Sequence, residues 1–278
     1  MFKIMGKIYH YTTIETLALI LKNKTIRFSR LDTLNDLEEG HITSCGIDVG
    51  KLAYVSCWTE NPKEAIPLWR IYGKNSMGIR IALEKDMFKD YEWTVEHCQE
   101  NNSLNIPIHG NGSAGKFKIP FSDCLNDGCV MIPPTTTKSF YFPMHYVEDI
   151  KPYIEESASI TQKHIESINL SNIGQYKHER WTFEEESRFI IYKHPIDIFE
   201  YLKDSTMETF SSGYINNRFD DLTSYDMHLK DDIFNCLEVR LSPAADESHK
   251  IIVDSLLKEY APKAICEESE LKTKVKFK

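Results

Sequence analysis

Residues 7–29 read KIYHYTTIETLALILKNKTIRFS and predict a β-α-β opening. Residues 7–11 predict a short strand, and Thr12 followed three residues later by Glu15 is a capping box that predicts the start of a helix. The apolar residues that share one face of this helix are Ile14, Leu17, Ala18 and Leu21. A second strand over residues 25–29 follows. The opening therefore brings a strand end, a helix N-terminus and another strand close together.

The rest of the chain mixes strands and helices without a regular alternation. Strands are predicted at residues 52–58, 78–83, 187–192 and 237–241, and helices from Pro67, at 155–170 and at 246–260. No internal repeat is present. This pattern predicts an α+β fold rather than a doubly wound parallel sheet. We expect one domain over residues 1–278, with a loop insertion at 99–118 because Asn, Gly and Ser are concentrated there.

The composition is that of an ordinary globular protein. The chain has 278 residues, of which 41% are hydrophobic and 27% charged, and no apolar run approaches the length of a membrane span. The N-terminus lacks the apolar stretch of a secretory signal, so we expect a cytoplasmic protein without a membrane partner. Seven scattered cysteines form neither a disulfide framework nor a zinc-type spacing. We expect reduced thiols and no metal.

Tyr9 to Thr12 form the first of three segments that concentrate polar residues beyond what folding needs. His10 would lie at the end of a strand, just before a helix N-terminus. An imidazole there can donate to a ribose hydroxyl or a carbonyl, while the helix dipole favours a nearby anion. The alternative is a histidine that simply packs at the strand end.

The second segment covers residues 29–38, where Arg30 leaves a strand and enters a loop rich in hydrogen-bonding groups. A guanidinium there suits a pyrophosphate, which it can bind with two parallel hydrogen bonds. The alternative is an ion pair from Arg30 to Asp32 or Asp36 that closes the loop.

The third segment covers residues 181–188, which read WTFEEESR. In an extended chain Glu184 and Glu186 share one face, so both could project into one site. A carboxylate there can hold a ribose hydroxyl and stabilise positive charge at an anomeric carbon. The alternative is a solvated run of charges. Three aromatic residues that could stack on a planar ring, or pack in the core, are Trp58, Trp69 and Tyr72.

In this order the segments resemble a bacterial domain family of unknown function that is assigned to the ADP-ribosyltransferase superfamily. The family motifs Y-H-Y-T, S-R…N-D…E, S-C-[FW]-[ST]-E with W-x-x-Y-[GA], and W-x-[YF]-E-x-E-x-R are matched by residues 9–12, 29–38, 56–73 and 181–188. The opening also resembles DNA-modifying ADP-ribosyltransferase toxins of the DarT kind. Two departures, Ser187 in place of a tryptophan and the insertion at 99–118, leave the acceptor open.

This resemblance implies an ADP-ribosyltransferase-like split β-sheet sandwich with flanking helices, and NAD as the substrate. Glu186, at the start of a late strand, would be catalytic, and Glu184 would be its helper. The nicotinamide amide and ribose would lie near His10, Tyr11 and Thr12, and the phosphates near Arg30. The nicotinamide ring would stack on Trp58, Trp69 or Tyr72. The residues expected to bind NAD are His10, Tyr11, Thr12, Ser29, Arg30, Asn35, Trp58, Trp69, Tyr72 and Arg188.

The leading hypothesis is a mono-ADP-ribosyltransferase that acts as a bacterial toxin or anti-phage effector, with an antitoxin or inhibitor as a partner. An NAD glycohydrolase and a non-catalytic NAD- or nucleotide-binding module are the alternatives. Nucleic acid is slightly preferred to protein as the acceptor, although the net charge of −9 disfavours non-specific nucleic-acid binding. Basic residues predicted to form a phosphate-binding rim are Lys116 and Lys118 beside the loop, and Lys272, Lys274, Lys276 and Lys278 on one face of a terminal strand.

Overall fold

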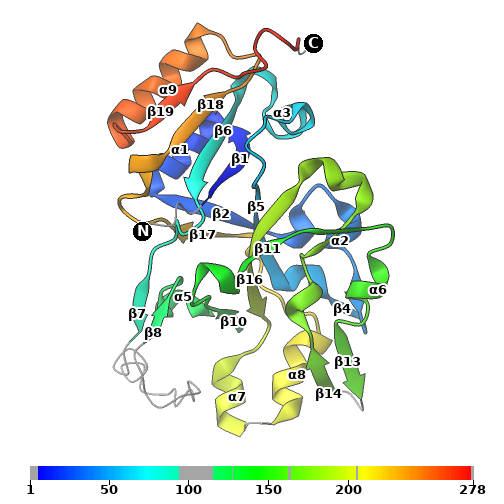
Figure 1. Cartoon of the computed structure of the whole chain (residues 1–278). Helices are drawn as coiled ribbons and strands as arrows, with labels where there is room; N and C mark the ends of the chain where they lie inside the picture. Colours follow the sequence, from blue (N-terminus) through cyan, green and yellow to red (C-terminus); the bar gives the residue numbers. More distant parts are fainter. Residues whose placement is uncertain (1–5, 94–114, 127, 162–163, 205, 277–278) are drawn as a thin grey trace.

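A large mixed sheet organises the α+β fold (Figure 1). A computed structural model describes residues 6–93, 115–126, 128–161, 164–204 and 206–276. Eleven strands form the sheet, and eight of them follow the order β19-β18-β6-β1-β5-β16-β10-β9. Their bounds are β19 Ile265–Glu267, β18 Glu238–Leu241, β6 Gly78–Glu84, β1 Lys7–Thr13, β5 Ala53–Thr59, β16 Glu186–His194, β10 Cys129–Ile132 and β9 Leu125–Asn126.

The other elements surround this path. β2 (Thr25–Arg30) pairs with β5 and with β17 (Ser224–His228), and β11 (Tyr141–Pro143) pairs with β16. Smaller strand pairs are β12 (His145–Val147) with β15 (Tyr176–His178), β13 (Ala158–Thr161) with β14 (His164–Ile168), β3 (Thr43–Ser44) with β4 (Ile47–Asp48), and β7 (Tyr91–Trp93) with β8 (Gly115–Phe117). The helices are α1 Ile14–Asn23, α2 Leu37–Gly40, α3 Ile66–Tyr72, α5 Phe121–Cys124, α6 Lys151–Ile154, α7 Ile198–Asp204, α8 Met207–Ile215 and α9 Glu247–Tyr260.

The sheet divides between β1 and β5. β1 pairs with β6 along its whole length, but it meets β5 only where Tyr9 lies opposite Thr59. Further along the same strand, Val55 and Tyr54 of β5 pair with β2 instead. The two halves of the sheet therefore diverge beside residues 56–58, with β19, β18, β6 and β1 in the upper half of Figure 1.

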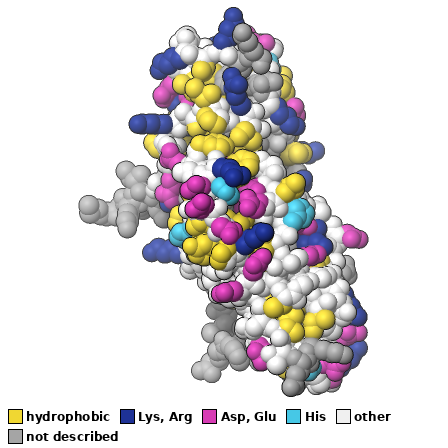
Figure 2. Space-filling model, turned by 90° about the vertical axis from the view of Figure 1, so that its right-hand side faces the viewer, with side chains coloured by type: hydrophobic (Ala, Val, Ile, Leu, Met, Phe, Trp, Pro, Cys, Tyr) yellow, Lys and Arg dark blue, Asp and Glu magenta, His cyan; other side chains and the backbone are white. Residues whose placement is uncertain are grey.

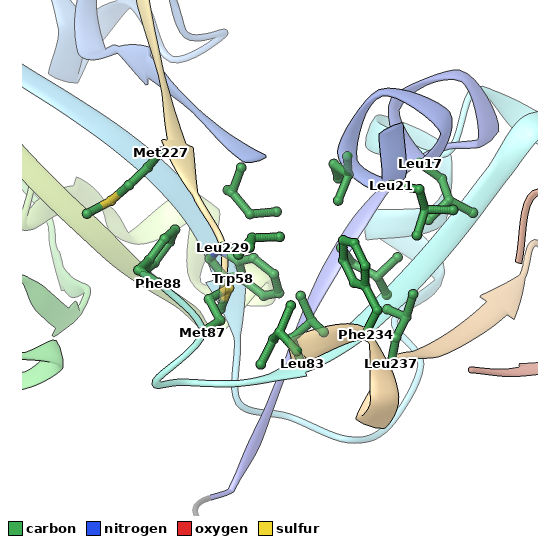
Figure 3. Close-up of a cluster of buried hydrophobic side chains, with 14 of the residues drawn as sticks. Leu17, Leu21, Trp58, Leu83, Met87, Phe88, Met227, Leu229, Phe234 and Leu237 are labelled. Atoms are coloured by element: carbon green, nitrogen blue, oxygen red, sulfur yellow. The ribbon is translucent and has the colours of Figure 1, made fainter. Parts of the chain in front are cut away.

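Both faces of β16 are buried, and each contributes to a different hydrophobic cluster. Phe189 and Ile191 pack into the larger cluster, part of which is shown in Figure 3. In that cluster α1 supplies Leu17 and Leu21, which lie close to Phe234 and Leu237. Ile190, on the opposite face, packs into a second cluster whose other buried members include Val55, Ile150, Ile173 and Tyr214. This alternation of side chains also decides which side chains of β16 reach the site.

Most of the predicted elements are confirmed, including both strands of the opening, the strands near residues 53, 78, 187 and 238, and the helix that ends at Tyr260. The capping position was predicted one residue early. Thr13, not Thr12, is the N-cap of α1, and its Oγ1 accepts from the backbone N–H of Thr16 at 3.4 Å. Thr12 instead continues the β1 ladder opposite Ile79.

The predicted helix over residues 155–170 is wrong. α6 ends at Ile154, and β13 and β14 then form an antiparallel hairpin. Branched side chains, which favour strands, come from Ile160, Thr161, Ile165 and Ile168, and Ile165 of β14 is buried in the second cluster. Packing of the hairpin thus overrides the helical spacing.

The predicted terminal strand is also wrong. Residues 270–274 form turns, with backbone hydrogen bonds from Lys272 to Ser269 and from Lys274 to Leu271. Leu271 packs against a small cluster built on Tyr11 and Trp69, which favours the turns over an extended chain. Lys278 and most of the predicted insertion at 99–118 lie outside the described residues.

No helix among the described residues is long and apolar enough to cross a membrane.

Candidate functional site

A pocket lies at the division of the sheet. The residues that line it come from β1, β5, α3, the 3-10 helix before β16 and the start of β16. They are Tyr9, His10, Tyr11, Cys57, Trp58, Thr59, Leu68, Tyr72, Glu184 and Glu186. Its cavity volume is about 60 Å³, whereas one water needs about 10–15 Å³. The pocket therefore has room for several waters or one small planar group, and a longer ligand must extend out of it.

Strand register explains why residues from distant parts of the sequence meet here. Thr59 lies opposite Tyr9 on one side and opposite Glu186 on the other, so β1, β5 and β16 are in line at this level. Beyond this point β1 leaves β5, and the Cys57 carbonyl accepts a hydrogen bond from His10 Nδ1 at 2.7 Å. A side-chain hydrogen bond thus replaces the backbone ladder at the division.

The hydrogen bond to Cys57 also decides what His10 can offer a ligand. Burial lowers the pKa of His10, so its ring is neutral at neutral pH. Because a carbonyl only accepts, Nδ1 carries the proton and Nε2 keeps a lone pair. The expectation that His10 donates to a ribose hydroxyl is therefore corrected: Nε2 is an acceptor. The indole of Trp58 lies beside the imidazole, with ring centroids 5.1 Å apart.

Glu184 and Glu186 meet at the pocket, but not through an extended chain. Glu184 ends a 3-10 helix over Glu179–Glu184, and Glu185 adopts a left-handed conformation with φ of 43° before β16 begins. The two carboxylates come together because this tight turn, not strand alternation, connects them. The backbone N–H of Glu186 donates to Tyr146 Oη at 2.8 Å, which fixes the start of the strand.

Each glutamate has its own partners. Tyr72 Oη donates to Glu184 Oε1 at 2.6 Å. Arg188 Nε donates to Glu186 Oε1 at 2.7 Å, and Arg188 Nη2 donates to Glu186 Oε2 at 3.1 Å. Lys177 Nζ lies between the two carboxylates, 2.5 Å from Glu184 Oε2 and 3.3 Å from Glu186 Oε2. Both glutamates are buried, so the three-glutamate run is not a solvated charge run.

Arg188 lies behind the pocket rather than in its wall. Its guanidinium is fully buried and binds Glu39 through two hydrogen bonds of 2.9 and 2.8 Å, besides those to Glu186. Arg188 does not line the pocket, so the structure does not support the expectation that it binds NAD. Its position is that of a side chain that holds Glu186.

These charges give the two glutamates different ionisation. Burial disfavours the ionised form of Glu186, but the positive charges of Arg188 and Lys177 outweigh it and hold its pKa at about 2. Burial and the charge of Glu186 raise the pKa of Glu184. The pair thus combines a carboxylate that is ionised at neutral pH with one that is easier to protonate.

Sequence reasoning missed Glu39 and Lys177. The motif match included Glu38, which is exposed, whereas its neighbour Glu39 is buried against Arg188. Adjacent glutamates on a short helix point in different directions, and no local pattern tells which faces the core. Lys177 is a single lysine in β15, in a segment without any recognised motif.

Of two other aromatic residues that were expected to bind NAD, Tyr11 lines the pocket and Trp69 does not. Tyr11 lines the pocket, and its Oη accepts from the backbone N–H of Ala65 at 3.0 Å. Trp69 is buried behind it, packs edge-on against Tyr11 and donates from Nε1 to Glu64. Trp69 therefore packs in the core, which was the alternative given for these aromatic residues. Thr12 does not line the pocket.

The second predicted segment lies away from the pocket. Arg30 donates to both carboxylate oxygens of Asp32, at 2.7 and 3.1 Å, and to the carbonyls of Asp220 and Leu222. This is the loop-closing ion pair named as the alternative. Ser29 pairs in the sheet and Asn35 is exposed, and neither lines the pocket. The expected phosphate contact at Arg30 therefore lacks structural support.

The predicted basic rim is not formed by the described lysines. Lys118 is buried and forms ion pairs with Asp86 and Asp90. Lys116 pairs with Glu92, and Lys272 pairs with Glu268. On the face shown in Figure 2, basic and acidic side chains are interspersed.

In the part of the chain that the structure describes, no group of three or more His, Cys, Asp or Glu side chains is placed to hold a metal ion. No family model matches the chain, and comparisons with curated proteins and with solved structures found no significant match.

Proposed function

We propose that the chain is a mono-ADP-ribosyltransferase that cleaves NAD and transfers ADP-ribose to a macromolecular acceptor. One observation carries the proposal. The pocket at the division of the sheet combines an ionised glutamate, Glu186, with a second glutamate, a neutral histidine and aromatic rings. The resemblance of the sequence motifs and the divided sheet support an ADP-ribosyltransferase-like split-sheet fold as part of this proposal.

The chemistry of the wall favours the nicotinamide end of NAD. No lysine or arginine is among the described lining residues, so the pocket has no such cationic side chain to pair with a phosphate. Carboxylates and aromatic faces attract a planar ring with positive charge, which is what the oxidised nicotinamide is. Of the three aromatic residues expected to stack on a planar ring, Trp58 and Tyr72 line the pocket. The phosphates and adenine would then lie outside the pocket.

Glu186 would act when the bond between nicotinamide and the ribose breaks. Nicotinamide leaves with the electron pair of the C–N bond and becomes neutral, while positive charge develops on the ribose. A fixed carboxylate near that charge stabilises the transition state more than the ground state. The acceptor nucleophile then bonds to the anomeric carbon and loses its proton, for which Glu184 is the nearest base of raised pKa. His10 Nε2 would accept from a ribose hydroxyl.

The acceptor and biological role rest on resemblance alone. The likeness of the opening to DNA-modifying toxins supports a nucleic-acid acceptor, and the lysine rim that would have added to it is not formed. We carry forward, as parts of the proposal, a cytoplasmic toxin or anti-phage effector and an antitoxin or inhibitor as its partner.

The test follows both products of the reaction. Purified protein is incubated with NAD labelled in its adenylate part, together with RNA, single-stranded DNA or a cell lysate, and E186Q serves as the control. We expect release of nicotinamide and transfer of label to a nuclease-sensitive product. Label confined to protein would contradict the nucleic-acid acceptor, and release without any transfer would indicate a glycohydrolase. Folded protein that neither binds millimolar NAD nor releases nicotinamide would contradict the whole proposal.

A further inference from the structure

Lys177 is a buried lysine that the proposed reaction does not use. It lies in β15, beside Tyr146 of β12 in the parallel pair, and only 2% of its surface is exposed. Its Nζ donates to Glu184 Oε2 and to Glu186 Oε2, and it lies 4.5 Å from the centre of the Trp181 ring. Burying an ammonium group is costly unless its partners compensate for the lost hydration. The location of Lys177 between two carboxylates therefore points to a function at the site.

We propose that Lys177 is a positioning residue, which holds the side chains of Glu184 and Glu186 in separate, fixed places at the pocket. Lys177 binds the Oε2 atom of each glutamate. The Oε1 atom of Glu184 is left to Tyr72, whereas Arg188 binds both carboxylate oxygens of Glu186 and shares Oε2 with Lys177. The catalytic consequence rests on the proposed function, whereas the effect on the two carboxyl groups does not.

The charge balance explains why Lys177 is needed. Three buried carboxyl groups, those of Glu39, Glu184 and Glu186, surround two buried cations, Lys177 and Arg188. Arg188 is already shared between Glu39 and Glu186. Without Lys177, Glu184 and Glu186 would repel each other at close range, and one of them would take up a proton. The titratable and charged groups that face Lys177 or the pair are Glu39 of α2, Cys57 of β5, Tyr72 of α3, Tyr146 of β12, Glu184 of the 3-10 helix, and Glu186 and Arg188 of β16.

The first experiment does not depend on enzymatic activity. The protein is labelled with ¹³C at the glutamate carboxyl groups, and the two signals are assigned with E184Q and E186Q. In the wild type we expect Glu186 to stay ionised at every pH at which the protein is folded. In K177Q and K177M one of the two carboxyl groups should titrate about 1–3 pH units higher, and K177R should retain the wild-type titration.

K193M is the matched control. Lys193 is equally buried and forms an ion pair with Asp220, but it lies at the other end of β16, roughly 20 Å from Glu186. K193M should leave both carboxyl titrations unchanged. Unchanged titrations in K177Q or in K177M, whichever folds, would overturn the proposal, as would an equal change in K193M.

The second experiment measures nicotinamide release. K177Q should lower kcat by about 100-fold, since displacement of a catalytic group by about 1 Å has that effect. KM should change much less, the pH profile should shift with the carboxyl titration, and K177R should recover part of kcat. If wild-type protein releases no nicotinamide, the proposed function fails while the titration still decides the role of Lys177. If K177Q keeps both wild-type kcat and pH profile, Lys177 does not position the pair.

Discussion

Glu186 is the residue on which the candidate site depends most. Its carboxylate closes an ion network that starts at Glu39 and passes through Arg188. The same groups that keep it ionised also hold it in place, so a single substitution changes both charge and geometry. Predictions for this residue therefore separate turnover from stability.

We predict that E186Q lowers the rate of nicotinamide release by roughly 100–1000-fold, the usual effect of removing one transition-state contact. The same change should reduce the free energy of unfolding by a few kcal/mol, because Arg188 loses a charged partner inside the protein. Single-turnover kinetics and urea unfolding measure the two effects. E185Q is the control, since Glu185 is exposed and its carboxylate accepts a hydrogen bond from Asn61 Nδ2 rather than from a residue of the pocket. Wild-type turnover in folded E186Q would rule out Glu186 as the catalytic group.

His10 should contribute to ligand binding as a hydrogen-bond acceptor. We predict that H10A weakens NAD binding by about 0.5–1.5 kcal/mol, the usual net value of one neutral hydrogen bond. Because the ring is neutral, the affinity should not rise as the pH falls from 8 to 6.5. Calorimetry at several pH values measures both. Binding that strengthens steadily with protonation over this range would contradict the neutral acceptor.

His194 should make the stability of the protein depend on pH. Burial lowers the pKa of His194 to about 4, from an ordinary value of 6.5. Below pH 6.5 the unfolded chain takes up a proton that the folded chain refuses, so stability falls as the pH drops toward 4. The limiting slope is about 1.4 kcal/mol per pH unit. Urea unfolding of wild type and H194Q at pH 5 and 7 checks this.

The stability change caused by His194 occurs in a different pH range from the one caused by Glu186. The pKa of Glu186 is held at about 2, below its ordinary value of 4.5, so its contribution is present above pH 4.5 and is lost only as the pH falls toward 2. Between pH 5 and 7 Glu186 should contribute no slope, and the difference between wild type and H194Q separates His194 from His10, whose pKa is also lowered by burial. Equal slopes in wild type and H194Q would show that His194 titrates normally in the folded protein.

At the scale of single elements, caps and branched residues decide what periodicity leaves open. Thr12 and Thr13 are both able to cap a helix, but the β1 ladder continues through both, and the helix begins at Ile14. Likewise, apolar residues between 155 and 170 have helical spacing, yet they form the β13–β14 hairpin. In both cases a neighbouring strand decides the outcome.

The position of the cap is testable by a pair of isosteric substitutions. T13V removes the hydroxyl that accepts from Thr16 N–H, and it should lower the free energy of unfolding by about 0.5–2 kcal/mol. T12V should cost less than 0.5 kcal/mol, because valine suits a strand and Thr12 is not the cap. Thermal or urea unfolding compares the two variants. A larger loss of unfolding free energy in T12V than in T13V would show that Thr12 is the N-cap.

At the scale of the whole molecule, the division of the sheet is the feature that creates the site. β1 and β5 pair as strands only where Tyr9 lies opposite Thr59, and side chains from four separate stretches of the chain line the pocket beside this point. Leu271 of the C-terminal segment packs behind the pocket wall, but the described lysines of that segment do not line the pocket. Lys274 and Lys276 belong to the segment after β19, of which residues 270–274 form turns.

We predict that neutralising the described tail lysines has little effect on transfer of ADP-ribose. The variant K272Q/K274Q/K276Q should keep nicotinamide release and transfer to RNA or single-stranded DNA within about twofold of wild type, because these residues do not form a basic strand face. The assay is run at low and high salt. A large loss of transfer with unchanged nicotinamide release would show that the tail binds the nucleic acid after all.

The sequence by itself determined the local features of this protein. The β-α-β opening, the strands β5, β6 and β16, and the helix α9 follow from alternating side chains, helical spacing and capping residues. These signals act between residues that are neighbours in the chain. It also pointed to His10, Tyr72, Glu184 and Glu186, which the pocket brings together. The order of the motifs had led to the expectation that these residues share one pocket.

Only the tertiary structure decided which charges are buried and what they contact. Glu39 is far in the sequence from Lys177 and Arg188, and each of the three would ordinarily be solvated. Their burial depends on how α2, β15 and β16 pack, and no local pattern encodes that packing. The same holds for Arg30, whose partner Asp32 was one of two candidates in the sequence. Long-range electrostatics depends on the final distances between charges, and those distances exist only after the chain has folded.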